Sequence, residues 1–266
     1  MNKFKYDATT SLKSLDRNKA HKFALSHSMM LYSKNALYSF IPKNACSTLR
    51  LSVAIENGFV DGSDHGHWIH ANNQTFNATL GEAIKVDYSF VVLRCPFRRL
   101  VSVFLDKFVA KEMDAWHYRS LMDYTVSLDD LSFREFVLSL KEAELVEENI
   151  HWREQTAFLI YQEYSDYFSL EQLPKAIKAL KKNINFKVVD ARSLTNHGTG
   201  HYEPLNDKSY ADTVAFDIAL MKRNGQCPSY ESMYDKELIE LVKSLYVEDL
   251  ELYVDKFGKS DLLFPA

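Results

Sequence analysis

The stretch from Leu37 to Glu56 changes its hydrophobic spacing halfway along, and this change constrains the fold more than any other feature of the chain. Apolar side chains cluster up to Ile41, as they do in a short buried strand. Pro42 ends that strand because proline has no backbone N–H to donate to a ladder. From Cys46 onward the apolar residues recur with the spacing of a helix. The sequence therefore predicts a strand, a tight loop and a helix.

The loop within this stretch carries groups that bind anions. It contains a lysine, an asparagine and two hydroxyl residues, and residues 33–50 include no acidic side chain. The first N–H groups of a helix have no partner inside the helix, and phosphate is the anion most often bound there. We therefore predict an anion site formed by Lys43, Asn44, Ala45, Cys46, Ser47 and Thr48.

The layout of this loop is that of a Walker loop, but its sequence is not. A Walker A loop reads GxxxxGK followed by Ser or Thr, whereas this loop has no glycine and its lysine comes first. Residues 42–48, PKNACST, instead resemble the 5′-phosphosulfate loop of the sulfotransferases, in particular the membrane-type carbohydrate sulfotransferases. Taken alone, the pattern also fits an ordinary strand-to-helix turn.

The stretch from Tyr88 to Val109 repeats this arrangement. Its first half is a near-continuous apolar run, which is typical of a parallel strand buried on both faces, and Pro96 suits the first turn of a following helix. Arg94 at the strand end and Ser102 eight residues later are similar to the 3′-phosphate motif of the same family, R-D/E-P-x-x-R-L-x-S-x-F/Y, with Cys95 in place of the acid. The resemblance implies that Arg94 and Ser102 hold the 3′-phosphate of a donor nucleotide.

The composition permits one large α/β domain. The chain has 266 residues, of which 46% are hydrophobic, and this is ample for a core. We expect residues 1–36 to be a polar N-terminal arm and residues 37–266 to form a single sulfotransferase-like α/β domain. Its core should be P-loop-like, with a parallel β-sheet flanked by helices and with helical and loop insertions. Ser132 and Glu135 form a capping-box pattern, and residues 235–257 indicate one long amphipathic helix.

Charge and cysteine content narrow the class of protein. A net charge of −4 argues against a general nucleic-acid binder, so the basic residues near the two motifs act locally. The three cysteines form no CxxC motif, which indicates free thiols in a reducing compartment and no metal cage. The N-terminus lacks the apolar core of a signal peptide, and no segment approaches the ~20 apolar residues of a membrane span. We therefore expect a cytoplasmic protein.

Three histidines lie in the loop between the two motifs, from Gly58 to Thr79. The spacing of His65, His67 and His70 suggests zinc, but no cysteine or glutamate completes a ligand set nearby. The HGH pattern resembles the uronyl 2-O-sulfotransferases, in which such a histidine takes the proton of the acceptor hydroxyl. The resemblance implies His67 as the general base, with His65 as the second choice and His70 in contact with the acceptor. Exposed loop histidines without a chemical role are the alternative.

The segment from Asn149 to Phe158 is similar to the HWxPQ segment of the carbohydrate sulfotransferases, with Glu154 where the family has proline. The resemblance makes His151 and Gln155 candidates for contacts with the acceptor or the active site. Trp152 is interpreted as a packing residue. A purely structural role for the whole segment is the alternative.

Residues 186–190, FKVVD, predict a strand whose end mimics a Walker B motif and would suit a P-loop kinase. A kinase also needs Mg²⁺ held against the phosphates and usually a glycine-rich cradle, and only the aspartate Asp190 is present. The sequence LTNHGTGHYEP that follows resembles a family loop that approaches the nucleotide. This makes Asn196 and Thr199 candidates for nucleotide binding.

The two phosphate motifs together imply a sulfotransferase that uses 3′-phosphoadenosine 5′-phosphosulfate (PAPS) and releases adenosine 3′,5′-bisphosphate (PAP). Lys43 is then a catalytic cation, because preorganised donors stabilise the charge that grows on the leaving 5′-phosphate. The transferred group carries less charge than a phosphoryl group, so no metal is required. The expected acceptor is a hydroxyl of a carbohydrate. A P-loop kinase and a nucleotide-binding protein without catalytic activity are the alternatives.

Overall fold

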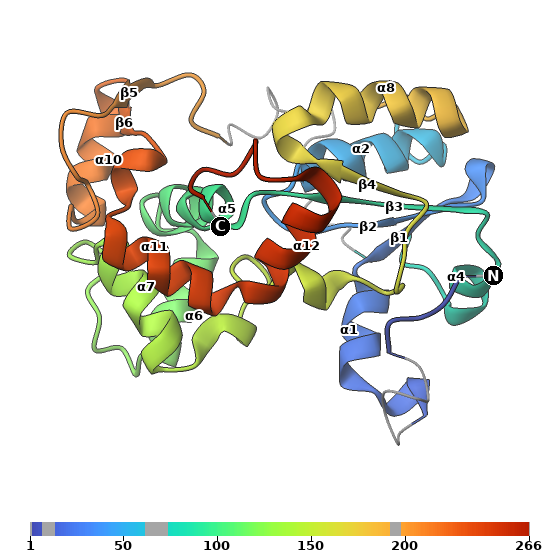
Figure 1. Cartoon of the computed structure of the whole chain (residues 1–266), viewed down its shortest axis with the longest axis horizontal. Helices are drawn as coiled ribbons and strands as arrows, with labels where there is room; N and C mark the ends of the chain where they lie inside the picture. Colours follow the sequence, from blue (N-terminus) through green and yellow to red (C-terminus); the bar gives the residue numbers. More distant parts are fainter. Residues whose placement is uncertain (1, 7–13, 62–73, 192–197, 266) are drawn as a thin grey trace. The chain divides into compact units, whose positions relative to one another are not determined.

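The computed structural model describes residues 2–6, 14–61, 74–191 and 198–265 (Figure 1). The chain forms two compact units, each described here by itself. The first comprises residues 1–94 and 155–196, and the second comprises residues 95–154 and 197–266. We predicted a single domain from residue 37 onward, and this stays a prediction. The division into two units arises because the chain leaves the first unit after Arg94 and returns to it at Gln155.

The first unit is built on a four-stranded sheet with the strand order β1-β2-β3-β4. Its strands are β1 (Ser28–Leu31), β2 (Ala36–Ser39), β3 (Tyr88–Leu93) and β4 (Asp166–Ser169). The strands β2, β3 and β4 run parallel, while β1 pairs antiparallel with β2 at one edge. The candidate site is built at the ends of β2 and β3.

Helices cover this sheet, as Figure 1 shows. Helices α2 (Cys46–Glu56) and α8 (Leu173–Ile184) lie on one side of it, and α1 (Lys19–Ser26) lies on the other. The predicted α/β fold, a parallel sheet flanked by helices, is therefore confirmed. Within the described ranges of this unit, the other helical segments are η1 (Leu15–Arg17), η2 (Tyr32–Lys34), α4 (Leu80–Lys85), η6 (Gln155–Phe158) and η7 (Leu170–Gln172).

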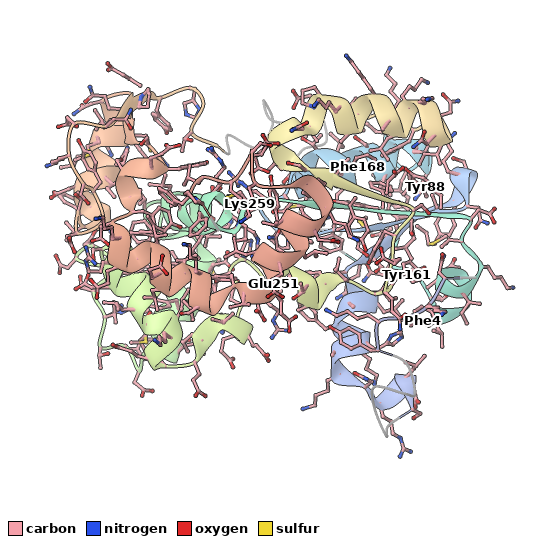
Figure 2. The ribbon with its side chains drawn as sticks, in the orientation of Figure 1. Phe4, Tyr88, Tyr161, Phe168, Glu251 and Lys259 are labelled. Carbon is pink, nitrogen blue, oxygen red and sulfur yellow. The ribbon has the colours of Figure 1, made fainter. Side chains whose placement is uncertain are left out.

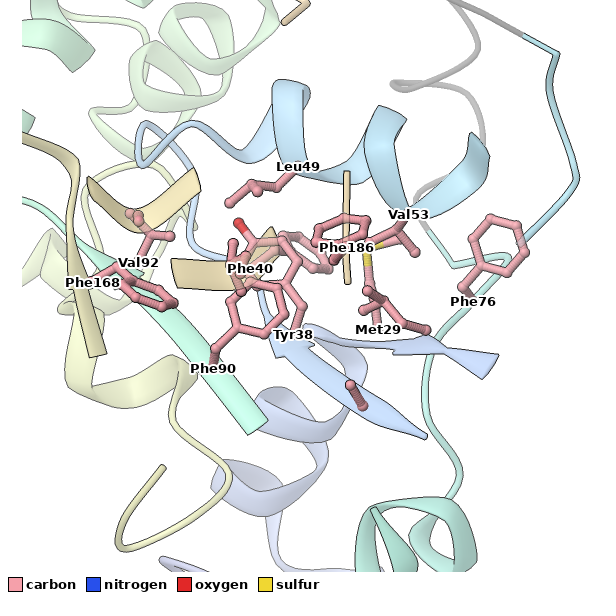
Figure 3. Close-up of a cluster of buried hydrophobic side chains, with 14 of the residues drawn as sticks. Met29, Tyr38, Phe40, Leu49, Val53, Phe76, Phe90, Val92, Phe168 and Phe186 are labelled. Atoms are coloured by element: carbon pink, nitrogen blue, oxygen red, sulfur yellow. The ribbon is translucent and has the colours of Figure 1, made fainter. Parts of the chain in front are cut away.

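A core of apolar side chains lies between the sheet and helix α2 (Figure 3), and side chains of α8 belong to the same cluster. Tyr38 of β2 stacks on Phe90 of β3 with ring centroids 4.9 Å apart, and both side chains are fully buried. Leu49 and Val53 of α2 and Leu180 of α8 pack into the same cluster. Full burial of one such side chain contributes ~1.5–3 kcal/mol. This packing holds in place the strand ends from which the candidate site projects.

Residues 1–36 include parts of the folded core, not only the polar arm that we predicted. Strand β1 lies within them, and its four residues are buried. Phe4 stacks on Tyr161 with 5.7 Å between the ring centroids (Figure 2). The N–H of Lys5 donates to the carbonyl of Ile160 at 2.8 Å. The sequence SMML of β1 has no β-branched or aromatic residue and so signals a strand only weakly; its pairing with β2 makes it one.

Residues 186–190, which we predicted to be a strand, form no ladder with the sheet of the first unit. Hydroxyl groups of α2 hold this segment instead. The N–H of Val189 donates to Ser52 Oγ at 2.8 Å, and the N–H of Ala191 donates to Thr48 Oγ1 at 3.3 Å. The segment therefore lacks the strand on which a Walker B aspartate sits, which weakens the kinase alternative.

The second unit is mainly helical. The long helix predicted over residues 235–257 is divided at Tyr246, whose backbone leaves the helical region with φ at −124°. Two short strands, β5 (Glu203–Leu205) and β6 (Gln226–Pro228), pair in parallel. Among the residues described in either unit, no helix is long and apolar enough to cross a membrane. The helical segments are α5 (Pro96–Val103), the π-helical turn η4 (Phe104–Phe108), α6 (Met113–Leu121), α7 (Phe133–Glu142), η5 (Leu145–Glu147), α10 (Ala215–Arg223), η8 (Glu231–Met233), α11 (Lys236–Leu245) and α12 (Val247–Phe257).

An aromatic cluster forms the core of the second unit. Phe108 of η4, Tyr118 of α6 and Phe136 of α7 meet around Trp152, and the centroids of Phe108 and Phe136 are 4.4 Å apart. Trp152 is fully buried, and its indole N–H donates to the carbonyl of Leu145 at 2.8 Å. The predicted packing role of Trp152 is confirmed.

Candidate functional site

The loop between β2 and α2 ends in an open helix N-terminus. Helix α2 begins at Cys46, and among the described residues no side chain caps it. Its first N–H groups therefore have no acceptor within the helix, and the positive end of the helix dipole favours an anion there. Lys43 and Ala45 adopt left-handed backbone conformations, with φ of 70° and 58°. Residues other than glycine do so rarely, and these two turn the chain sharply into the helix.

The predicted loop residues differ in their exposure. Asn44 is fully buried and Thr48 is 6% exposed. Thr48 Oγ1 accepts a hydrogen bond from the N–H of Ala191, and a hydroxyl that accepts one bond can still donate its own hydrogen. The other four residues of the loop are partly exposed: Lys43, Ala45, Cys46 and Ser47. The loop therefore combines residues that anchor it in the protein with residues that solvent or a ligand can reach.

Arg94 follows the last residue of β3 and reaches this loop. Its Nη1 donates to the carbonyl oxygen of Lys43 at 3.0 Å, and its side chain is partly exposed. The two segments meet because β2 and β3 are parallel neighbours, so the residues that follow them emerge at the same edge of the sheet. The structure thus brings an arginine of the second motif against the loop of the first.

Gln155 lies between these two segments. Its Oε1 accepts from the backbone N–H of Arg94 at 3.0 Å and from Asn44 Nδ2 at 2.6 Å. Gln155 is only 1% exposed. We predicted Gln155 as a contact for the acceptor or the active site; the structure shows that its amide bonds to the protein's own phosphate motifs.

In the second unit, α5 carries Ser102, which is buried, and also Arg99, which sequence reasoning left without a role. Arg99 Nη1 donates to the carbonyl of Arg153 at 2.6 Å, and Nη2 donates to that of Ile150 at 3.2 Å. Arg99 therefore ties α5 to the segment that contains His151. Arg99 is the second arginine of the 3′-phosphate motif, which singles out the position but does not indicate these carbonyl partners.

His151 is paired with a carboxylate that sequence reasoning missed. His151 Nδ1 lies 2.9 Å from Asp114 Oδ1, and both side chains are 19% exposed. Asn149 Nδ2 donates to the same oxygen at 2.9 Å, and Lys107 Nζ lies 3.7 Å from Asp114 Oδ2. Asp114 is remote from His151 in the sequence and lies in the first turn of α6, so no local pattern links the two residues.

The surroundings of Asp114 determine its charge. Burial by itself would raise the pKa of Asp114, but the hydrogen bonds and charge of His151, together with Asn149 and Lys107, lower this pKa below its ordinary value. Asp114 is therefore ionised at neutral pH. A carboxylate at Nδ1 stabilises the imidazole tautomer that keeps its hydrogen there, and Nε2 is then the atom that can accept a proton.

Four of the predicted residues, His65, His67, His70 and Asn196, lie outside the described residues. Thr199 belongs to the second unit, where its Oγ1 donates to the hydroxyl of Tyr230 at 3.4 Å. Within the described ranges, no three His, Cys, Asp or Glu side chains come together in a way that could hold a metal ion.

Comparison with known proteins gives the family. The family model described as "Sulfotransferase family" matches residues 26–254, which include both phosphate motifs and the segment around His151. The match covers most of the chain, so this chain belongs to the sulfotransferase family, as the resemblance of its motifs predicted. Neither a curated protein nor a solved structure matched the chain.

Proposed function

We propose that this sulfotransferase transfers a sulfuryl group from PAPS to a hydroxyl of a carbohydrate and releases PAP. The observation that carries the proposal is the hydrogen bond of 3.0 Å from Arg94 Nη1 to the carbonyl of Lys43. It holds a cationic side chain beside the uncapped N-terminus of α2. A nucleotide with anionic groups at both its 5′ and 3′ positions calls for two such neighbouring sites.

The donors of the loop suit the leaving group of the reaction, which is the 5′-phosphate. The acceptor oxygen attacks sulfur in line, the bond from sulfur to the bridging oxygen of the phosphosulfate breaks, and negative charge grows on the 5′-phosphate. Lys43, Ser47, Thr48 and the first N–H groups of α2 are the donors that we assign to this charge. Such donors are most effective when their positions are set before the reaction, and the left-handed turn at Lys43 and Ala45 sets them.

The second motif suits the other end of the nucleotide. We assign Arg94 and Ser102 to the 3′-phosphate, because an arginine forms strong charge-assisted hydrogen bonds with phosphate. Asn196 and Thr199 are proposed to complete the nucleotide contacts. These groups bind a part of the donor whose charge does not change in the reaction.

The acceptor hydroxyl must lose its proton as the new bond to sulfur forms. His67 is our first choice for this base and His65 the second, and His70 and His151 are placed among the acceptor contacts. The pairing of His151 with Asp114 supports His151 as a further candidate, since a carboxylate at Nδ1 orients the imidazole. The acceptor is proposed to be a carbohydrate because the segment around His151 is similar to that of carbohydrate sulfotransferases.

Transfer of label from ³⁵S-labelled PAPS to a panel of oligosaccharides, with simple alcohols as controls, tests this proposal. We expect label on a sugar hydroxyl, and we expect PAPS to raise the melting temperature while ATP with Mg²⁺ does not. Stabilisation by ATP with Mg²⁺ alone would favour a kinase. Binding of PAP without transfer to any acceptor would favour a nucleotide-binding protein without catalytic activity.

Replacement of the histidines identifies the base. If His67 is the base, His67→Ala should lower turnover by ~10²–10⁴ while the affinity for PAPS is unchanged. The wild-type rate should fall as the pH drops below ~6.5, because the base must be neutral, and this acid limb should disappear in the variant. His65→Ala and His70→Ala are the matched controls. An active His67→Ala enzyme together with an inactive His151→Ala enzyme would assign the base to His151.

A further inference from the structure

Gln155 is enclosed where the two phosphate motifs meet, and its hydrogen bonds leave only one orientation for its amide. Its Nε2 donates to the carbonyl of Arg94 at 2.9 Å, and its Oε1 accepts from the N–H of the same residue at 3.0 Å. A backbone N–H can only donate and a carbonyl can only accept. The positions of the nitrogen and the oxygen of this side chain are therefore determined by the backbone of Arg94.

The same Oε1 connects Arg94 to the phosphosulfate loop. It accepts from Asn44 Nδ2 at 2.6 Å, and Asn44 Nδ2 also donates to the carbonyl of Val92 at 2.9 Å. Strand β2 ends at Ser39, which lies opposite Val91 of β3. Beyond that pair the two amide side chains make bonds to the β3 backbone of the kind that a neighbouring strand would make.

Losing the hydrogen bonds of Asn44 and Gln155 should destabilise the protein, because both side chains are buried. Asn44 is fully buried and Gln155 is 1% exposed. Removing one partner of a buried hydrogen bond leaves the other unsatisfied, and water cannot replace it there. The loop at Asn44, the strand end at Arg94 and the side chain of Gln155 therefore move as one body.

A fixed spacing between these segments matters for the donor. The 3′-phosphate and the 5′-phosphosulfate sit on one ribose, so the covalent structure of the nucleotide limits their separation. A site whose two halves are already at that separation avoids the cost of ordering them on binding. We propose that Gln155 is a positioning residue that sets the spacing of the two phosphate sites and acts through Arg94 and Asn44. This inference rests on the proposed function, since it takes PAPS as the ligand.

The test compares two nucleotides in a variant without the amide. Gln155→Leu keeps most of the volume and removes both hydrogen-bonding ends. Titration calorimetry with PAP and with adenosine 5′-phosphate gives the preference for the 3′-phosphate. We expect Gln155→Leu to reduce this preference by at least ~10-fold, which corresponds to about 1.4 kcal/mol. Gln162→Leu, at an exposed glutamine of the same unit, should leave it unchanged.

Combining Arg94→Ala with Gln155→Leu distinguishes a positioning role of Gln155 from a general loss of stability. In wild-type protein Arg94→Ala should remove most of the preference for PAP, whereas in the Gln155→Leu background it should remove much less, because the two residues act as one unit. If Gln155→Leu does not fold, Gln155→Glu replaces it, since a carboxylate keeps the acceptor oxygen and loses the donor to the Arg94 carbonyl. Fully additive effects of the two substitutions would overturn the proposal.

Hydrogen exchange at the N–H of Arg94 provides a readout that needs no ligand. Loss of the bond to Gln155 should speed exchange at this position in Gln155→Leu. Faster exchange with an unchanged preference for PAP would overturn the proposal, because the bonds would then have no effect on the spacing. If wild-type protein bound neither nucleotide, the proposed function would fail. Hydrogen exchange alone would then decide whether Gln155 holds the strand end at Arg94. Faster exchange in Gln155→Leu would support this positioning role, and unchanged exchange would overturn it.

Discussion

The two strand-to-helix connections of the candidate site both present hydrogen-bond donors, but one uses its backbone and the other a side chain. After β2, the left-handed residues Lys43 and Ala45 turn the backbone into a helix whose N-terminus has no side-chain cap. After β3, Cys95 keeps a negative φ of −49°, and α5 starts on Pro96. The first connection therefore offers backbone N–H groups to an anion, while the second offers the side chain of Arg94.

This difference predicts that the two connections have different roles in the reaction. Backbone donors fixed by a strained turn suit charge that develops during the reaction, because they need no rearrangement. A long side chain such as that of Arg94 suits a phosphate whose charge is constant. Substitutions in the first connection should therefore act on turnover, and substitutions in the second should act on affinity for the donor.

The largest effect is expected at Lys43. Lys43→Ala should lower turnover by ~10²–10³, the range for loss of one donor to a developing charge. Its affinity for PAP should change far less, because the ammonium meets charge that grows in the transition state. Steady-state kinetics and calorimetry on the same preparation measure both quantities. Wild-type turnover in this variant would show that the loop does not contact the reacting group.

The next effect is expected at Arg94. Arg94→Ala and Ser102→Ala should each weaken the binding of PAP and leave the binding of adenosine 5′-phosphate nearly unchanged. A charge-assisted hydrogen bond contributes ~1.5–3 kcal/mol, so the Arg94 variant should lose roughly 10–100-fold in affinity. Titration with both nucleotides measures this. Equal losses for the two nucleotides would place these residues away from the 3′-phosphate.

A smaller effect tests the accessibility of the two connections through their cysteines. Cys46 starts α2 and is partly exposed, whereas Cys95, which precedes α5, is fully buried. Burial also raises the pKa of Cys227 to about 11, which keeps that thiol protonated and unreactive. An alkylating reagent should therefore modify Cys46 first.

Donor binding should protect this cysteine. At ten times its dissociation constant, PAP should slow the modification of Cys46 by about 10-fold, because only the free protein reacts. Peptide mass spectrometry follows the reaction at each cysteine, and adenosine at the same concentration is the control. Equal rates with and without PAP would show that the nucleotide does not cover the start of α2.

The smallest effect concerns the turn itself. The left-handed conformation costs a residue other than glycine ~1–2 kcal/mol, while glycine loses ~0.5–1 kcal/mol through its flexible unfolded state. Ala45→Gly should therefore stabilise the protein by up to ~1.5 kcal/mol, seen as a modest rise in melting temperature. Ala54→Gly, in the interior of α2, is the control and should destabilise it. A loss of stability in both variants would contradict the strain that we assign to Ala45.

Features that depend on neighbouring residues were predictable from the sequence. Helix α2 begins at Cys46 where the spacing becomes helical, and Pro96 starts α5. The Ser132 and Glu135 capping box at the start of α7 is present with both of its hydrogen bonds. Each of these signals lies within a few residues, where propensity and spacing act directly.

Features that depend on distant residues were not predictable. Strand β1 exists because it pairs with β2, and its own sequence carries little strand signal. The partners of Gln155 and His151 come from remote positions in the chain, so the roles of Asn44 and Asp114 appear only in the folded structure. The break at Tyr246 coincides with a contact to a remote residue, since the hydroxyl of Tyr246 donates to the carbonyl of Trp152 at 2.6 Å.

The discontinuity of the first unit has a consequence for synthesis on the ribosome. Strand β3 pairs with β4, but residues 94–165 are made between them. At ~5–20 residues per second this interval lasts roughly 4–15 s. During that time the backbone N–H and C=O groups on the β4-facing edge of β3 have no partner strand, and such an edge favours association between nascent chains. The yield of native protein should therefore depend on translation speed and on chaperones that bind this edge until β4 emerges.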